Sequence, residues 1–273
     1  MEDMHKQKIL YVRQFETGGK KEQNIYDEIL IYPYTSKWER KCKRLCFSLG
    51  VGRNWLVESF KDVDLDSYDL IVLVELCSWN PVPVIQYIRE QNSHCHLLYW
   101  MRNTWFAEKY GTGITEENFQ NFLDQQEKFG FKIIAYDKGD CRRYGLLYAP
   151  QASLRWELDE LQRSKNFYQP QWDVFWYGKD KDRIGKVLSI KKYCDEHELT
   201  YSMNTLRMNQ KHYTVEEKTV LAKRGMSYKE YLEMILKSRA TLDILQRRQE
   251  GLGARPVETL QLERKLITDY TGI

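Results

Sequence analysis

The segment LDILQRRQEGLGARPVETLQLERKLIT covers residues 242–268 and has the pattern of a strand, a glycine turn, a helix and a second strand. Two glycines, Gly251 and Gly253, come shortly before Pro256. Proline fits the first turn of a helix, where its missing N–H leaves no bond unmade, and glycine lets the backbone approach a ligand closely. We therefore expect a helix to begin close to Pro256, directly after a glycine loop.

The start of this helix would suit an anion, because the first N–H groups of a helix have no partner within it. Arg255 adds a positive charge at that place, and Glu258 lies one turn further on, where a carboxylate can accept two hydrogen bonds from a vicinal diol. Phosphate and sugar hydroxyls could thus be held within a few residues. A glycine loop before a helix also occurs in many α/β proteins for structural reasons alone, and the spacing does not separate the two readings.

The same segment resembles the C-terminal nucleotide-sugar domain of bacterial glycosyltransferases with the two-Rossmann GT-B fold, of the kind found in capsule, exopolysaccharide and lipopolysaccharide-core gene clusters. That group carries the pattern LDI-x-Q-x-x-Q-x-G-L-x-x-R-P-x-E-x-L followed by a K-K-L-I-T strand. The segments FWYGKDKDR, residues 175–183, and YDKGDCRRYGLLYAPQ, residues 136–151, resemble other parts of the group. The chain matches the first pattern at Leu242, Asp243, Ile244, Gln246, Gln249, Gly251, Leu252, Arg255, Pro256, Glu258 and Leu260.

The resemblance implies an α/β protein of two Rossmann-like domains that face a cleft. We place an N-terminal acceptor-side domain at 1–168 and a C-terminal nucleotide-sugar-binding domain at 169–273. The boundary is set in a charged stretch that ends at Pro170. Relatives usually continue past the last strand with further strands and a long helix, so we expect the C-terminal domain to be truncated or to lack that clasp.

A donor site in the second domain is the next expectation. Basic residues follow the strand at 173–178, and in the resembling enzymes this loop meets the donor diphosphate, where positive charge stabilises the departing nucleoside diphosphate. A solvated lysine-rich turn is the alternative for these residues. The expected donor-binding residues are Gly178, Lys181, Arg183, Gln249, Gly251, Gly253, Arg255 and Glu258.

The first domain should supply the acceptor side, because ligands of open α/β sheets bind outside the carboxyl ends of the strands. Two apolar strands, at 68–76 and 94–103, end in polar and aromatic residues. Candidates for contact with the acceptor are Ser78, Trp79, Asn80, Arg102 and Trp105, and Glu75 and Asn103 are weak candidates for a catalytic role. Glu75 can equally be a buried, hydrogen-bonded carboxylate, and the sequence assigns no catalytic base.

Local patterns predict several further elements. Residues 116–129 should form a helix with Phe119, Phe122 and Leu123 on one side, followed by a strand at 132–136. A second amphipathic helix is expected at 226–240, with Ser227 as its N-cap.

Composition excludes several classes of protein. Hydrophobic residues make up 42% and charged residues 30% of the chain, as in folded globular proteins, and a net charge of +3 is too small to indicate nucleic acid as a partner. The six cysteines form no C-x-x-C pair, and neither a signal peptide nor an apolar run of membrane-spanning length is present. We expect a cytoplasmic protein with free thiols.

Two further features of the sequence bear on metal and membrane contacts. The triplet HCH at 94–96 and the D-x-D strings at 62–66 and 180–182 have no second ligand cluster with suitable spacing, so no metal and no other cofactor is expected. The basic segment 37–53 beside Trp38 reads as a docked helix with a solvated charged side. Because such a face can bind anionic headgroups, contact with the inner face of the plasma membrane is the alternative.

These observations favour a glycosyltransferase of hexosyltransferase type, which moves a sugar from a nucleotide-sugar donor to a cell-surface polysaccharide or a lipid-linked glycan precursor. Whether the transfer inverts or retains configuration is left open. The alternative is a catalytically silent protein of the same fold, which binds a nucleotide sugar or pairs with an active glycosyltransferase.

Overall fold

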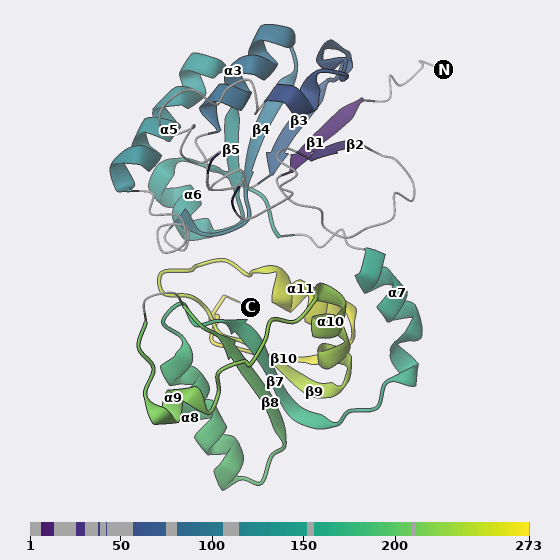
Figure 1. The fold of residues 1–273 in the computed structure, drawn as a ribbon, viewed down its shortest axis with the longest axis vertical. Coiled ribbons are helices and arrows are strands. Elements are labelled where there is room, and N and C mark those ends of the chain that lie inside the picture. Colours follow the sequence, from purple (N-terminus) through teal and green to yellow (C-terminus); the bar gives the residue numbers. More distant parts are fainter. Residues whose placement is uncertain are drawn as a thin grey trace. The chain divides into compact units, whose positions relative to one another are not determined.

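The computed structural model describes residues 7–13, 26–30, 38, 42, 57–74, 81–105, 115–151, 156–208 and 211–272. The chain forms two compact units, the N-terminal unit Met1–Ala149 and the C-terminal unit Pro150–Ile273. Both are α/β units in which every strand pairing is parallel (Figure 1). The expectation of two Rossmann-like domains is confirmed at this level.

The N-terminal unit holds a six-stranded sheet in the order β2-β1-β3-β4-β5-β6. Its centre is apolar because β3 carries the run LIVLV, which is covered on both faces, as is usual for a central parallel strand. The strands are β1 Ile9–Arg13, β2 Asp27–Leu30, β3 Leu70–Val74, β4 His96–Met101, β5 Lys132–Ala135 and β6 Leu147–Tyr148. The described helices are α3 Val82–Gln91, α5 Glu116–Phe129 and α6 Lys138–Tyr144, with short 3-10 turns η1 Glu58–Phe60 and η2 Leu65–Ser67.

Helix α5 shows how local sequence sets the boundaries of an element. Its start is capped by the Thr115 side chain, which accepts from the Asn118 N–H, and it ends at Gly130 in the left-handed conformation. Phe119 and Leu123 are buried against the sheet. The predicted bounds 116–129 and the predicted buried side are thus confirmed.

The C-terminal unit holds a four-stranded sheet in the order β10-β9-β7-β8. Helices α8 and α9 lie on one face and α10 and α11 on the other (Figure 1). The strands are β7 Trp172–Lys179, β8 Tyr201–Leu206, β9 Ser238–Asp243 and β10 Lys265–Thr268. The helices are α7 Trp156–Ser164, α8 Ile184–Glu196, α9 Val215–Lys218, α10 Tyr228–Leu236 and α11 Ala254–Gln261, with the 3-10 turn η3 Lys165–Phe167.

Two sequence predictions are confirmed in this unit. Ser227 caps α10 through a capping box with Glu230, although the helix ends at Leu236 and not at the predicted 240, because Ser238–Asp243 form β9. The segment 242–268 forms the end of β9, a glycine loop, α11 and β10, in the predicted order, and α11 begins at Ala254, two residues before Pro256.

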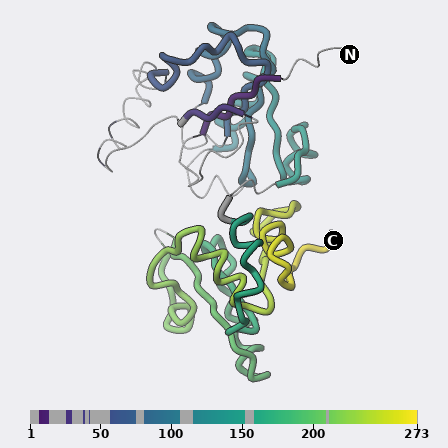
Figure 2. Tube along the Cα trace, turned by 90° about the vertical axis from the view of Figure 1, so that its right-hand side faces the viewer, coloured from purple at the N-terminus to yellow at the C-terminus, as the bar shows by residue number. Residues whose placement is uncertain are grey.

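The division between the units lies between Ala149 and Pro150, earlier than the boundary near 168 expected from the charged stretch. Leu158 and Leu161 of α7 are buried in one cluster with Leu232 and Leu236 of α10. Figure 2 shows α7 alongside the helices of the C-terminal unit. The charged residues of this stretch form the outer side of the docked amphipathic helix α7. Their composition resembles that of a hinge, and for this reason the sequence suggested a boundary here.

Within the described residues, no helix is both long enough and apolar enough to cross a membrane.

Candidate functional site

The carboxyl edge of the four-stranded sheet has the topology of a ligand site. The chain proceeds from β7 outward to β8 and then returns to β9 on the other side of β7, so the strand order reverses between β7 and β9. Open α/β sheets bind ligands at such a switch point. The last paired residues of these two strands are Phe175 and Thr241, and both strands continue beyond that pair. The carbonyl groups of the two strand ends therefore need other partners.

Two arginines supply those partners. Arg255 donates from Nη2 to the Tyr177 carbonyl and from Nη1 to the Leu242 carbonyl at 3.3 Å. Arg183 donates from Nη1 to the Ile244 carbonyl at 2.9 Å and from Nη2 to the Lys179 carbonyl at 2.6 Å. The arginine pair, Arg183 and Arg255, thus ties the end of β7 to the end of β9, and these guanidinium donors are used inside the unit.

Both guanidinium groups lie against the same indole ring, that of Trp176. The Cζ atoms of Arg255 and Arg183 lie 4.5 Å and 4.9 Å from the ring centroid of Trp176, which is fully buried. Cation–π attraction offsets part of the repulsion between two like charges. The indole N–H of Trp176 donates to Thr205 Oγ1 at 3.1 Å, which fixes the plane of the ring.

Gly178 lies close to the arginine pair and to Trp176. A Cβ added there would lie 3.1 Å from Arg255 Nη2, 3.3 Å from Arg183 Nη2 and 3.3 Å from the Trp176 ring. The absence of a side chain at Gly178 therefore makes room for groups of the protein itself. It does not by itself indicate a ligand.

Asp243 is the carboxylate closest to this cluster. Its Oδ1 lies 3.6 Å from Arg255 Nη1, and the side chain is buried. Burial raises the pKa of Asp243, while the charges of Arg255 and Arg183 act in the opposite direction. The two guanidinium groups at the strand ends thus lie close to carboxylates, with Asp243 beside Arg255 and Asp180 bonded to the Arg183 N–H.

Helices α8, α10 and α11 of the C-terminal unit begin at this edge. At α8 and α10, side chains accept hydrogen bonds from the first N–H groups of the helix. At α8, Asp180 Oδ1 accepts from the N–H groups of Arg183 and Ile184 at 3.1 and 3.0 Å. Asp180 is fully buried and its other oxygen pairs with Lys211 Nζ at 2.6 Å. The start of α10 is closed by the capping box described above.

The start of α11 is different. Its N-cap is Gly253, and within the described part of the chain no side chain caps it. By helix geometry the N–H groups of Ala254 and Arg255 have no intrahelical partner. Pro256 has no N–H group. Among the described residues, a Cβ at Gly253 would have only Gln249 Nε2 within 4 Å, at 3.9 Å. This start is the place where the edge can receive an anion.

The loop before α11 is held by Gln249. Its Oε1 accepts from the Gln246 N–H at 3.2 Å, and its Nε2 donates to the Gly251 carbonyl at 2.6 Å. Arg248 stands at φ 65°, a left-handed conformation that is costly for a residue with a side chain. Gln249 and the buried Gly251 therefore shape the loop, and the donor-binding role expected for them would be an indirect one.

Lys181, after β7, has a similar backbone conformation, with φ 40°, and its side chain is half-buried. The other two basic residues expected to meet a diphosphate, Arg183 and Arg255, donate to strand-end carbonyls.

Glu258 is buried between α10 and α11. The residue is only 5% exposed, and its Oε1 accepts a hydrogen bond from the Tyr228 hydroxyl at 2.8 Å. The ring of Tyr231 lies beside the same carboxylate, and burial raises the pKa of Tyr231, with Arg255 opposing and Glu258 adding to the rise. The Glu258 carboxylate thus interacts with both Tyr228 and Tyr231 inside the unit.

The candidates of the N-terminal unit are described only in part. Glu75, Ser78, Trp79 and Asn80 lie outside the described residues. Arg102 and Asn103 are half-buried directly after β4, at the carboxyl edge of the sheet.

Trp105 is a core residue. It is 4% exposed, its ring stacks on Phe119 with centroids 3.9 Å apart, and its indole N–H donates to Glu116 Oε2 at 3.1 Å. A ring that holds a sugar must present one face to solvent, so the prediction that Trp105 does so is wrong. An aromatic residue after a strand end has the same appearance in sequence whether it lines a cleft or fills a core.

Asp140 is a residue that the sequence did not single out. Its Oδ2 accepts from the Trp105 backbone N–H at 2.6 Å and the side chain is buried at the start of α6. Burial raises the pKa of Asp140 to about 6, against the effect of the Trp105 bond, and Asp137 adds to the rise. The one available signal was the D-x-x-D spacing from Asp137, which caps α6 by accepting from the Asp140 N–H.

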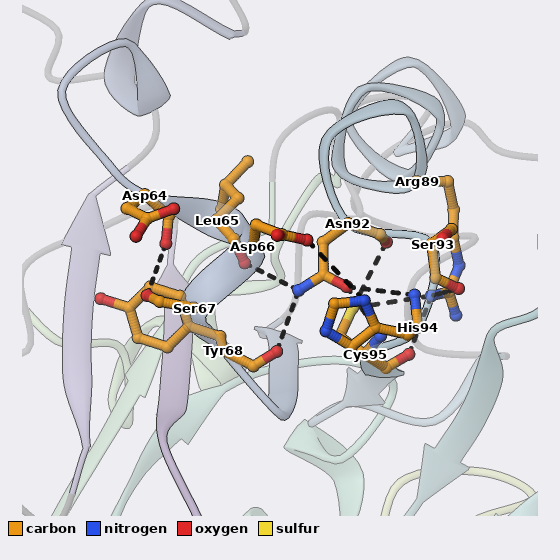
Figure 3. Close-up of polar contacts among 10 residues, drawn as sticks. All are labelled: Asp64, Leu65, Asp66, Ser67, Tyr68, Arg89, Asn92, Ser93, His94 and Cys95. Carbon is orange, nitrogen blue, oxygen red and sulfur yellow. Dashed lines mark hydrogen bonds and ion pairs between the residues drawn. The ribbon is translucent and has the colours of Figure 1, made fainter.

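The HCH triplet has a structural role. Asn92 is fully buried; its Nδ2 donates to the carbonyls of Leu65 and Tyr68 at 2.8 and 2.9 Å. Its Oδ1 accepts from the N–H groups of His94 and Cys95 at 3.1 and 2.8 Å (Figure 3). The triplet thus begins as a turn, held by Asn92, at the amino end of β4, on the opposite edge from any strand-end site.

No group of three or more His, Cys, Asp or Glu side chains that could hold a metal ion occurs in the ranges that the structure describes. The His94 side chain is exposed and lies 3.7 Å from Asp66 Oδ1, as Figure 3 shows.

Comparison with models of known protein families gives no match, and comparison with curated proteins gives none either.

Proposed function

We propose that the chain is a glycosyltransferase of hexosyltransferase type that takes its sugar from a nucleotide-sugar donor. The observation that carries the proposal is the uncapped start of α11, which follows a glycine loop at the switch point of a parallel sheet. Such a start combines free N–H groups with the positive end of a helix dipole and so suits a diphosphate. The resemblance of residues 242–268 to the donor domain of GT-B enzymes gives that diphosphate an identity.

In the proposed reaction an acceptor hydroxyl oxygen bonds to the anomeric carbon of the donor sugar while the bond from that carbon to the diphosphate oxygen breaks. The hydroxyl proton passes to a base or to the departing nucleoside diphosphate. The α11 start and Lys181 stabilise the negative charge that develops on the diphosphate. Glu258 receives the ribose hydroxyls and Gly253 allows close approach. Gln249 and Gly251 shape the loop, and the arginine pair contributes by its charge. No metal or other cofactor enters the proposed reaction.

The acceptor in this proposal is a cell-surface polysaccharide or a lipid-linked glycan precursor, bound on the side of the N-terminal unit at the inner face of the plasma membrane. Trp38, in the basic segment 37–53, is 76% exposed, which fits contact with a lipid surface. Most of that segment lies outside the described residues.

The second candidate function is a catalytically silent protein of the same fold that binds a nucleotide sugar or pairs with an active glycosyltransferase. It is favoured by the commitment of polar groups inside the unit. The guanidinium groups of Arg183 and Arg255 donate to strand-end carbonyls, and the Glu258 carboxylate already accepts from Tyr228. Fewer free charges then remain to stabilise a leaving group.

The two functions separate in one experiment. The protein is incubated with UDP-, GDP- and dTDP-sugars. Binding is measured by thermal shift, and slow hydrolysis of the donor is measured by the release of the nucleotide. Stabilisation with release supports the transferase, and stabilisation without release supports the silent protein. If none of these nucleotides stabilises the fold, both are excluded. Lys181→Ala should weaken binding, whereas Lys192→Ala, which removes a lysine from the exposed surface of α8, should not.

A further inference from the structure

A buried carboxylate paired with a lysine stands where β7 passes into α8. Asp180 is fully buried, and its Oδ1 accepts from the N–H groups of Arg183 and Ile184 at the start of α8. Its Oδ2 lies 2.6 Å from Nζ of Lys211, whose side chain is 31% exposed. Burying a charge is costly unless the charge is paired, so the contact with Lys211 offsets the cost of burying Asp180.

Lys211 follows β8 in the chain and is itself held in place. Its Nζ lies 5.4 Å from the ring centroid of Tyr213, and the Tyr213 hydroxyl accepts from the Met208 N–H at 2.8 Å. Burial alone would lower the pKa of Lys211, but the hydrogen bond with Asp180 outweighs this effect and the pKa is raised. The ammonium group is therefore charged at neutral pH.

The residues from Asp180 to Arg183 form a tight turn. The Arg183 N–H donates to the Asp180 carbonyl at 2.7 Å, and the two central residues, Lys181 and Asp182, have φ values of 40° and 64°. Glycine and asparagine usually occupy such positions, because other side chains are strained there. A strained conformation persists only where its surroundings hold it, and the hydrogen bonds that Asp180 accepts from the start of α8 hold this turn.

This turn lies beside the proposed donor site. Arg183, at the end of the turn, and Arg255, in the first turn of α11, lie against the same Trp176 ring. The starts of α8 and α11 are thus neighbours, and Lys181, in the turn itself, is a residue that our proposal assigns to the diphosphate. An unpaired negative charge on Asp180 would oppose a diphosphate at this place, because charges inside a protein are only weakly screened.

We propose that Lys211 is a positioning residue that acts through Asp180: it cancels the charge of the buried carboxylate and so allows a nucleoside diphosphate to bind beside the start of α8. This inference rests on the proposed function. Lys211 needs no contact with the nucleotide for this role, because its Nζ lies against the Asp180 carboxylate. The carboxylate in turn keeps the shape of the turn that carries Lys181.

The test is calorimetric titration of UDP, GDP and dTDP, and of the corresponding monophosphates, into the wild-type protein and Lys211→Met. Methionine keeps an unbranched apolar stem and removes the charge. We expect the affinity for the diphosphates to fall by about tenfold and that for the monophosphates to fall less, since repulsion grows with the charge of the ligand. A merely structural role for Lys211 would lower both affinities equally, so an unchanged ratio of diphosphate to monophosphate affinity overturns the proposal.

A double variant tests whether Lys211 acts through the carboxylate. Asp180→Asn keeps an oxygen for the N–H groups of Arg183 and Ile184 and removes the charge. Combined with Lys211→Met, it should restore the wild-type ratio of diphosphate to monophosphate affinity. A double variant whose ratio is as low as that of Lys211→Met would show that Lys211 acts on the nucleotide directly, and would overturn the proposal.

The matched control is Lys191→Met. Lys191 Nζ lies 2.7 Å from Asp195 Oδ2 and 5.5 Å from the ring centroid of Tyr201, so its contacts are of the same kind and length as those of Lys211. This pair lies at the opposite edge of the sheet, where β8 begins, and the Asp195 side chain is 49% exposed. Lys191→Met should bind every nucleotide like the wild type. A fall in its diphosphate to monophosphate ratio equal to that of Lys211→Met would contradict the role given to Lys211.

If Lys211→Met does not fold, the double variant alone provides the test, because it removes both charges of the pair together. A wild-type ratio then supports the proposal, and a reduced ratio overturns it. Binding of the wild type to none of the three diphosphates removes the proposed function and this inference together. An unchanged ratio in Lys211→Met, with diphosphate binding by the wild type, removes this inference alone.

Discussion

Arg255, in the first turn of α11, donates a hydrogen bond to the backbone carbonyl of Tyr177 in β7. This bond joins the helix start that we propose as a phosphate site to the central strand of its sheet. With Arg183 it closes the gap between two strand ends that no longer pair. We therefore place the proposed donor site at the N-terminus of α11, next to the arginine pair.

Arg255→Ala is expected to destabilise the C-terminal unit by about 2–4 kcal/mol, because it leaves strand-end carbonyls without donors and Asp243 without its nearest charge. Urea unfolding followed by tryptophan fluorescence measures the loss. Arg239→Ala is the control: Arg239 is 71% exposed and pairs with Asp173 at 3.3 Å, so its removal should change stability by no more than about 1 kcal/mol. Equal effects of the two variants would contradict the role given to Arg255.

Gly178→Ala should cost about 1–3 kcal/mol, since its methyl group would press on both guanidinium groups and on Trp176. At Gly185, in α8, an added Cβ meets nothing within 4 Å, and alanine is a better helix former than glycine by about 1 kcal/mol. Gly185→Ala should therefore raise the melting temperature while Gly178→Ala lowers it. A Gly178→Ala protein as stable as the wild type would show that the arginine pair can move aside freely.

The stability of the N-terminal unit should depend on pH through Asp140. Its pKa in the folded protein is raised from 3.8 to about 6, so the folded state binds this proton more tightly than the unfolded state does. The free energy of unfolding contributed by Asp140 is therefore largest below about pH 4 and is lost as the pH rises to about 6. Asp140→Asn should remove this dependence and stabilise the protein at pH 7.5 by on the order of 2 kcal/mol.

Urea unfolding of the wild type and of Asp140→Asn at pH 4.5 and pH 7.5 checks this expectation, because titration of other groups cancels in the difference. Glu116, Asp137 and Arg143 surround Asp140 and are retained in both proteins. A difference between the two proteins that does not change with pH would show that Asp140 titrates at its ordinary value.

Trp105→Ala should destabilise the N-terminal unit by about 3–5 kcal/mol, because it removes a ring stacked on Phe119 from the core. Phe167, which is 86% exposed, offers a contrasting position, and Phe167→Ala should be nearly neutral. Thermal unfolding distinguishes the two. A neutral Trp105→Ala would return Trp105 to the set of acceptor-side candidates.

The elements of the fold follow from local sequence to a large extent. Thr115 and Gly130 bound α5, and Ser227 with Glu230 starts α10, because a cap acts on the N–H groups next to it in the chain. The helix start near Pro256 follows from a different local rule, the fit of proline to the first turn of a helix. The unit boundary was missed because α7 is charged on its outer side, and its burial depends on Leu232 and Leu236, far along the chain.

The site is less predictable because its chemistry depends on tertiary geometry. Arg183 and Arg255 have the sequence context of phosphate ligands, and their donors turn inward because β7 and β9 separate after Phe175 and Thr241. Asp140 acquires its raised pKa from burial, against the effect of the hydrogen bond from the Trp105 N–H. Neither effect leaves a local pattern in the sequence.

The measurement that tests the central claim most directly is nucleotide binding by Gly253→Asp. The backbone at Gly253 is extended, with φ −71° and ψ −166°, and a Cβ there meets only Gln249 Nε2 at 3.9 Å, so an aspartate fits as an N-cap of α11. Its carboxylate would occupy the place of the diphosphate, as Asp180 does at α8. We predict a fold stabilised by about 1 kcal/mol whose affinity for UDP and GDP is reduced at least tenfold, with Gly253→Asn, which caps without charge, reduced less. A Gly253→Asp protein that binds these nucleotides as tightly as the wild type would contradict the account.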